Sequence, residues 1–176
     1  ILYIRSSSCN MHIEIERKFL VKDQSFKQMA TSHSHTQQGY MDVRGATVRI
    51  RLRDDKAFLT IKGKSNDGGV SRYEFEREIP VADAEEMLQL CMAGRVDKTR
   101  WLVPYGGRTF EVDEFHGEND GLIMAELELE SRDEQYERPP FLDTEVTGDR
   151  HFYNKYLITN PFPSWSEEVM PRYRNQ

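Results

Sequence analysis

Carboxylate and basic side chains alternate with apolar residues in short runs along this chain of 176 residues. In MHIEIERKFLV, residues 11–21, Glu14, Glu16 and Lys18 occur at every second position. Successive side chains of a β-strand point to opposite faces, so these three share one face. Such a face offers oxygen ligands to a divalent cation and an ammonium group to an anion.

The alternation returns in further segments, and the sign of the charge changes from one segment to the next. VRIRLR (48–53), LTIKGK (59–64) and DKTRW (97–101) present basic residues, whereas YEFERE (73–78), FEVDEF (110–115) and AELELE (125–130) present acidic ones. The charged residues that this pattern selects are Arg49, Arg51, Arg53, Lys62, Glu74, Glu76, Lys98, Arg100, Glu111, Asp113, Glu126, Glu128 and Glu130.

This sorting of charge by segment favours an enclosed channel over an exposed sheet face. Exposed faces usually mix the two signs, because rows of like charge repel each other. If the apolar faces point outward beneath helices, the charged faces line a tunnel in which acidic and basic walls compensate each other. The alternative is an open sheet whose charged faces meet water, and the pattern alone leaves it open.

The elements that must position these residues indicate one antiparallel, barrel-like domain of the α+β class, with a few helices packed outside. We expect helices over residues 80–94 and 149–158. Residues 22–36 are expected to form a short helix and a polar loop that holds His33 and His35. Residues 1–10 are interpreted as an extension, residues 11–160 as the domain, and residues 161–176 as a tail with a short helix.

Composition excludes several functional classes. No apolar run approaches the roughly 20 residues that span a bilayer, so no membrane association is expected. The net charge of −6 argues against a general nucleic-acid binder. Two cysteines do not form a disulfide framework, which favours a reducing cytoplasm.

The motif Glu14-Ile-Glu16-Arg-Lys18 is similar to the ExExK signature of the CYTH superfamily, the triphosphate tunnel metalloenzymes. The six charged blocks named above, and the stretch from Glu145 to Lys155, follow in that family's order. The resemblance covers residues 11–160 and implies an eight-stranded antiparallel β tunnel with a charged interior. Within the family, the chain resembles the short bacterial inorganic triphosphatases, which implies metal-dependent hydrolysis of tripolyphosphate to pyrophosphate and phosphate.

The resemblance also implies roles for individual residues. Mg²⁺ or Mn²⁺ would be held by Glu14, Glu16, Glu126 and Glu128. Phosphate groups would be bound by Lys18, Arg49, Arg51, Lys62, Lys98, Arg100 and Lys155. Further tunnel lining would come from Arg53, Glu74, Glu76, Glu111, Asp113 and Glu130. Tyr40, which follows a Gln-Gly pair, would accept a proton in concert with Lys18, provided that its pKa falls well below about 10.

Alternatives remain at this level. The hydroxyl of Tyr40 could equally have a structural role, and Lys155 could equally be a lysine on a helix face without a role in binding. Two other functions fit the same residues: a class IV type adenylyl cyclase, and a polyphosphate-binding module without catalysis. A homodimer is possible. The polyanionic triphosphate is the only partner that the residues themselves indicate.

Overall fold

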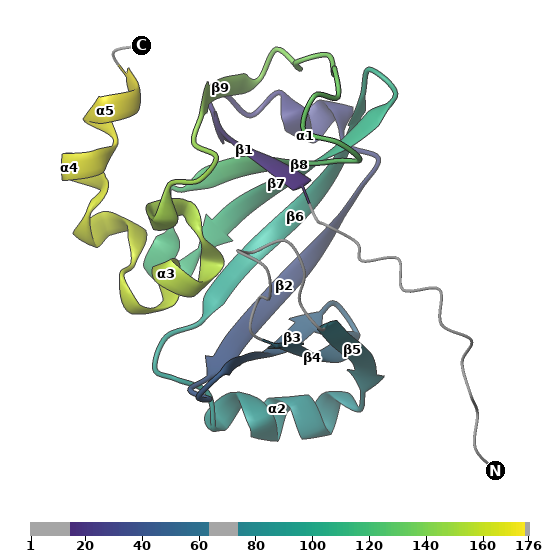
Figure 1. Ribbon diagram of the computed structural model, residues 1–176, viewed down its shortest axis with the longest axis vertical. Coiled ribbons are helices and arrows are strands. Elements are labelled where there is room, and N and C mark those ends of the chain that lie inside the picture. The colour runs from purple at the N-terminus through teal and green to yellow at the C-terminus, as the bar shows by residue number, and fades with distance from the viewer. Residues whose placement is uncertain (1–14, 64–73, 175–176) are drawn as a thin grey trace.

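The computed structural model describes residues 15–63 and 74–174, and a single curled sheet dominates it (Figure 1). Its strands are β1 (Ile15–Val21), β2 (Ser32–Met41), β3 (Ala46–Arg53), β4 (Lys56–Gly63), β5 (Glu74–Ile79), β6 (Val96–Tyr105), β7 (Arg108–His116), β8 (Ile123–Leu129) and β9 (Leu142–Glu145). The helices are α1 (Phe26–Met29), α2 (Val81–Gln89), α3 (Asn154–Thr159), α4 (Ser166–Val169) and α5 (Pro171–Arg174).

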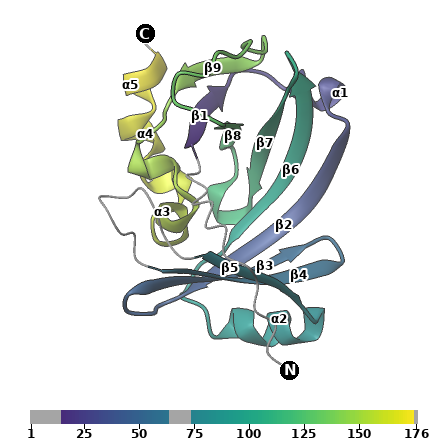
Figure 2. The ribbon, with the colours of Figure 1, turned by 45° about the vertical axis from the view of Figure 1, so that its right-hand side comes forward.

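The strands lie in the order β5-β4-β3-β2-β6-β7-β8-β1-β9, and every ladder among the described residues is antiparallel. The strands β3, β4 and β5 cross beneath the long strand β2, while β6, β7, β8 and β1 rise beside it (Figure 2). The predicted α+β class with antiparallel strands is confirmed. The described sheet has nine strands, because the short β9 adds to the free edge of β1.

The outward face of the sheet is apolar and is covered in two places. One cluster joins Phe19, Val112 and Leu127 of the sheet to Phe26 of α1. The other joins Ile50 and Ala57 to Ala84 and Leu88 of α2. These are the faces opposite the alternating charges, so the period of two in the sequence correctly predicts which face is buried under helices.

The inward face changes character along the strands. Lys18 and Leu20 of β1 share this face, as do Glu126 and Met124 of β8. At the Leu20 and Met124 end it becomes apolar and packs against Phe152, Leu157, Trp165 and Val169 of the C-terminal region. The segment beyond residue 160 therefore belongs to the domain core, although the sequence suggested only a tail.

Three expected boundaries were wrong. The loop predicted to hold His33 and His35 is the first half of β2, because Ser32 to Gln37 pair with Asp97 to Leu102 of β6. The helix expected over residues 80–94 is α2, which ends at Gln89. The helix expected over residues 149–158 is a 3-10 turn, residues 150–152, followed by α3.

Gly39 lies where the loop after α2 crosses β2. A Cβ atom at this position would lie 2.9 Å from Cys91 Sγ and 3.1 Å from Leu88 Cδ2. Glycine is thus required by close packing, since its backbone conformation is an ordinary one. None of the described helices is long and apolar enough to span a membrane.

Candidate active site

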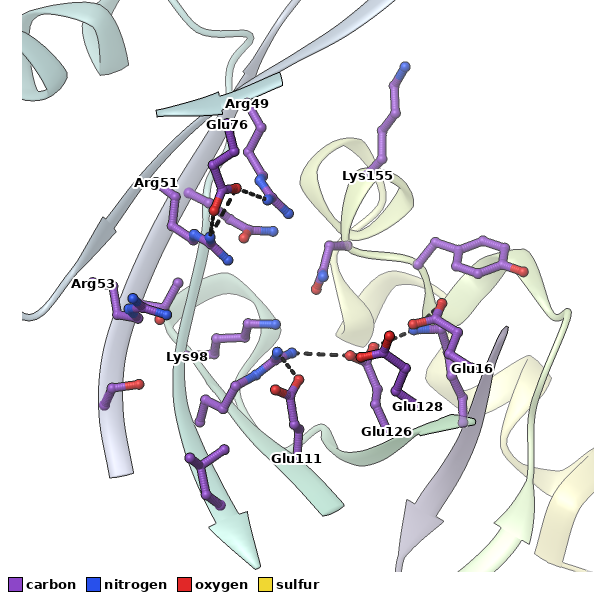
Figure 3. Close-up of a pocket in the computed structure, with 18 of the residues that line it drawn as sticks. Glu16, Arg49, Arg51, Arg53, Glu76, Lys98, Glu111, Glu126, Glu128 and Lys155 are labelled. Atoms are coloured by element: carbon purple, nitrogen blue, oxygen red, sulfur yellow. Dashed lines mark hydrogen bonds and ion pairs between the residues drawn. The ribbon is translucent and has the colours of Figure 1, made fainter. Parts of the chain in front are cut away.

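The inward face encloses a cavity of about 940 Å³. Most of the predicted site residues line it: Glu16, Lys18, Tyr40, Arg49, Arg51, Arg53, Lys62, Glu76, Lys98, Arg100, Glu111, Glu126, Glu128 and Lys155. The arginines of β3 lie on one side with Glu76, and Glu16, Glu126 and Glu128 lie on the other (Figure 3). The charged faces thus line a cavity, which favours the enclosed channel over the open solvated sheet.

Strand register explains how the acidic wall forms. Glu16 of β1 lies directly opposite Glu128 of β8, and Glu126 of β8 lies directly opposite Glu111 of β7. Like charges directly opposite each other across a ladder destabilise the pair. A bound cation would relieve this repulsion, and carboxylate oxygens are the ligands that hard divalent cations prefer.

The carboxylates of this wall therefore fit a divalent metal, although the structure describes only some of the predicted ligands. The described residues hold no ready-made group of three His, Cys, Asp or Glu side chains around one point. The predicted ligand Glu14 lies outside the described residues. Among the described residues, the Glu128 carboxylate makes no hydrogen bond or ion pair.

Lys18 lies between the carboxylates of Glu16 on its own strand and Glu126 on β8. Only 5% of it is exposed. Its ammonium group pairs with Glu126 and, at 3.1 Å, with Glu16. Burial opposes the charged form, but Glu126 and Glu16 outweigh it and raise the pKa of Lys18. Lys18 is accordingly a cation at neutral pH.

The main chain of Lys18 is fixed from its other edge by the segment after β9. Its N–H donates to Thr147 Oγ1 at 2.9 Å, and its carbonyl accepts from Val146 N–H at 2.8 Å. Thr147 in turn donates to Glu145 Oε1 at 2.6 Å. The predicted block that begins at Glu145 therefore holds the first strand at the level of its signature lysine.

A second network lies deeper, at the floor of the cavity. Asp113 is fully buried and accepts hydrogen bonds from Lys98 Nζ at 2.5 Å, from Arg100 Nε at 2.7 Å and from Arg100 Nη2 at 2.6 Å. Burial favours the neutral acid, but Lys98 and Arg100 outweigh burial and lower the pKa of Asp113 to about 2. The same burial and the neighbouring Arg100 lower the pKa of Lys98.

Arg100 joins this floor to the acidic wall. It pairs with Glu111 and, at 3.1 Å, with Glu126. Burial raises the pKa of Glu126 and so does Asp113, but Lys18, Lys98 and Arg100 reverse this and leave that pKa lowered. Glu126 is therefore ionised at neutral pH, and its ion pairs with Lys18 and Arg100 already compensate opposite charges in the ligand-free protein.

Tyr40 lies at the level of the arginines, directly opposite Arg49. Its side chain is 7% exposed, and its hydroxyl accepts a hydrogen bond from Gln38 Nε2 at 3.1 Å. Burial raises the pKa of Tyr40, although Arg49 and Arg51 act in the opposite direction. A raised pKa is the reverse of what a proton acceptor needs.

Two predicted lining residues lie elsewhere. Asp113 does not line the cavity, because it is buried beneath it among Lys98 and Arg100. Glu130 follows the last residue of β8, and its side chain is 88% exposed beside Arg108. The side chain of Glu74 lies outside the described residues, as Glu14 does. Lys155 lines the cavity, and its ammonium group points away from the arginines of β3 and from the glutamates of the acidic wall (Figure 3).

Sequence reasoning missed a polar stripe on β2. Ser32, Ser34, Thr36 and Gln38 line the cavity together with Tyr40. They follow the same period of two, so the signal was present, but the polar composition of residues 32–37 was interpreted as a loop. Asn154 at the start of α3 also lines the cavity, and no alternating pattern marks it.

Fold and cavity together define a class of protein: an antiparallel sheet curled around a pocket with one acidic and one basic wall. Such a pocket suits a ligand with several anionic groups that binds together with cations. The chain belongs to the CYTH domain family, whose model matches residues 12–153.

Individual similar proteins support this assignment to the family. The chain is 41% identical over 156 residues to an inorganic triphosphatase of Acetivibrio thermocellus, which covers 88% of this chain and 98% of the relative. It is 35% identical over 150 residues to an inorganic triphosphatase of Nitrosomonas europaea, with 82% and 95% covered. The crystal structure of the inorganic triphosphatase NE1496 superposes with a TM-score of 0.62 at 31% identity, over 82% of this chain and 93% of that one.

Proposed function

We propose that this protein hydrolyses inorganic tripolyphosphate to pyrophosphate and phosphate, with Mg²⁺ or Mn²⁺ as the metal. The observation that carries the proposal is the cavity itself, in which guanidinium groups of β3 face carboxylates of β1 and β8. Two relatives that are more than 30% identical are named inorganic triphosphatases, which supports the same substrate.

The acidic wall is the proposed metal site. Glu16, Glu126 and Glu128 would hold the cation, with Glu14 as a fourth ligand. When bound, the metal would neutralise phosphate oxygens and polarise the bond that breaks. The adjacent Lys18 is protonated and so would bind a phosphate oxygen rather than accept a proton.

The basic wall is the proposed phosphate site. Arg49 and Arg51 supply planar guanidinium groups that match phosphate oxygens, and Lys62 supplies a point charge at the same end of the cavity. Lys98 and Arg100 are already bound to Asp113, so they would act chiefly by the positive potential they add to the floor. Phosphoryl transfer needs mainly such positioning and charge neutralisation.

Tyr40 has two possible roles under this proposal. Because Gln38 donates to its oxygen, its own O–H is free to donate toward the cavity. With its pKa raised by burial, we propose that Tyr40 donates a hydrogen bond to the substrate and stays protonated. The role of proton acceptor implied by the resemblance stays a prediction that a Phe variant would test.

The test is release of phosphate from tripolyphosphate by the purified protein across Mg²⁺, Mn²⁺ and pH. We expect equal amounts of phosphate and pyrophosphate, and loss of turnover in Arg51→Gln. Arg172→Gln is the matched control, because Arg172 lies on α5 with an exposed side chain that pairs with Glu168. Cyclic AMP from ATP without phosphate release from tripolyphosphate would indicate a cyclase, and binding without turnover would indicate a polyphosphate-binding module; either result would refute hydrolysis. Cytoplasmic location and dimer formation stay predictions.

A further inference from the structure

Thr60 of β4 is a buried polar residue behind the arginine wall. None of its surface is exposed. In the strand register it lies directly opposite Arg49 of β3 on one side and Glu76 of β5 on the other. Its hydroxyl donates to Glu76 Oε2 at 2.7 Å and accepts from Arg49 Nη2 at 3.1 Å. The sequence pattern did not select it, because its side chain carries no charge.

Glu76, held in this way, contacts both arginines of the proposed phosphate site. Its Oε2 accepts from Arg49 Nη2 at 3.1 Å, and its Oε1 accepts from Arg51 Nη2 at 3.0 Å. The two guanidinium groups are therefore fixed by one carboxylate, and that carboxylate is fixed by one hydroxyl (Figure 3 shows the three charged groups).

The Nε donor of each guanidinium, which adjoins the Nη2 that binds Glu76, has no partner among the described residues. Among the described residues, Arg49 Nε and Arg51 Nε are buried and make no hydrogen bond. A buried donor without a partner is costly and uncommon in native proteins. Both arginines line the cavity, so their guanidinium groups lie where an anion with oxygen acceptors would bind.

We propose that Thr60 is a positioning residue for the phosphate site: through Glu76 it orients the guanidinium groups of Arg49 and Arg51 toward a phosphate group in the cavity. This rests on the proposed function, because it takes a polyphosphate as the ligand. The physical basis is preorganisation, since an arginine that is already held in its binding geometry loses less freedom when the anion arrives.

Thr60→Val tests this without any change of charge. It removes the hydroxyl and keeps the shape, while Thr60→Ser keeps the hydroxyl. Thr31→Val is the matched control, because Thr31 is exposed outside the cavity and donates only to the Leu102 carbonyl, at 3.3 Å. Should Thr60→Val not fold, Thr60→Ala takes its place. Calorimetric titration with tripolyphosphate in EDTA gives Kd, and turnover with Mg²⁺ gives KM and kcat separately.

We expect Thr60→Val to raise both Kd and KM by about tenfold with kcat within about twofold, and Thr60→Ser to remain within about threefold of the wild type in Kd. In a Glu76→Gln background the effect of Thr60→Val should shrink to about twofold, because the residue acts through Glu76. An undiminished effect in that background, or a Thr60→Val protein that binds as the wild type does, overturns the inference. A wild type that neither binds nor hydrolyses tripolyphosphate refutes the proposed function itself.

Discussion

Replacement of Asp113 by asparagine should destabilise the fold by several kcal/mol, because it removes the carboxylate beneath the cavity. Asp113 accepts hydrogen bonds from both Lys98 and Arg100 and is fully buried. The asparagine side chain has nearly the same shape but no charge. It leaves two cations close together with one counter-charge fewer.

Two estimates bound the effect. Removing one partner of a buried ion pair costs about 3–5 kcal/mol, since the remaining charge stays desolvated. The pKa of Asp113 falls from 3.8 to about 2 on folding. At about 1.36 kcal/mol for each pH unit, this is about 2 kcal/mol of stability at neutral pH. The lowered pKa of Lys98 shows that burying its charge offsets part of the gain. We therefore expect a loss of about 2–4 kcal/mol.

Urea unfolding followed by tryptophan fluorescence at several pH values measures this. A carboxyl whose pKa is lowered by folding stabilises the protein above its unfolded pKa and stops doing so as pH falls through the folded value. The difference in unfolding free energy between wild type and Asp113→Asn should thus be full at pH 7 and shrink to about half by pH 3.

Asp97→Asn is the control for this experiment. Asp97 binds His35 at 2.7 Å and Gln37 at 2.8 Å on the outward face, where its side chain is 30% exposed. Its loss should cost at most about 1 kcal/mol. A cost below about 1 kcal/mol for Asp113→Asn at pH 7, equal to that of the control, would refute the view of Asp113 as the counter-charge of the floor.

Three further substitutions test the site and its support. Glu128→Gln should raise the Mg²⁺ concentration needed for half-maximal turnover by about tenfold without changing the melting temperature; an unaltered metal titration would contradict a ligand role. Tyr40→Phe should lower kcat, and the wild-type rate should show no rise between pH 7 and 9 that the variant lacks, because a raised pKa keeps the phenol protonated there; such a rise, lost in the variant, would instead identify a proton acceptor. Gly39→Val should destabilise by about 1–3 kcal/mol in thermal unfolding, because its side chain meets Cys91 and Leu88; a neutral result would show that the loop after α2 moves freely.

The walls of the cavity were predictable because strand geometry has a period of exactly two residues. Once residues 48–53 and 125–130 are interpreted as strands, Arg49 and Arg51 must share a face, and so must Glu126 and Glu128. That these faces meet in one cavity required the further step of sorting them by charge, since curling of the sheet is not encoded in any single strand.

Two features were not predicted by this reasoning. The polar run Ser32–Gln37 has little intrinsic preference for a strand, and its pairing with β6 decides its structure. The depth of Asp113 is equally hidden, because its alternation is identical to that of Glu111. Only the neighbouring strands show that Asp113 is buried between Lys98 and Arg100 while Glu111 reaches the cavity.

The ion pairs inside the ligand-free cavity also indicate which kind of ligand binds there most tightly. Lys18 with Glu126, and Arg49 with Glu76, form ion pairs that make burial of so many charges tolerable. An anion alone would compete with the carboxylates for these cations and leave the acidic wall uncompensated. A cation alone would do the same to the basic wall. A polyphosphate that binds together with a divalent cation supplies both signs at once, so each wall gains a partner as its internal pairs loosen. The two-signed lining therefore favours tighter binding of a metal–polyphosphate complex than of either component alone.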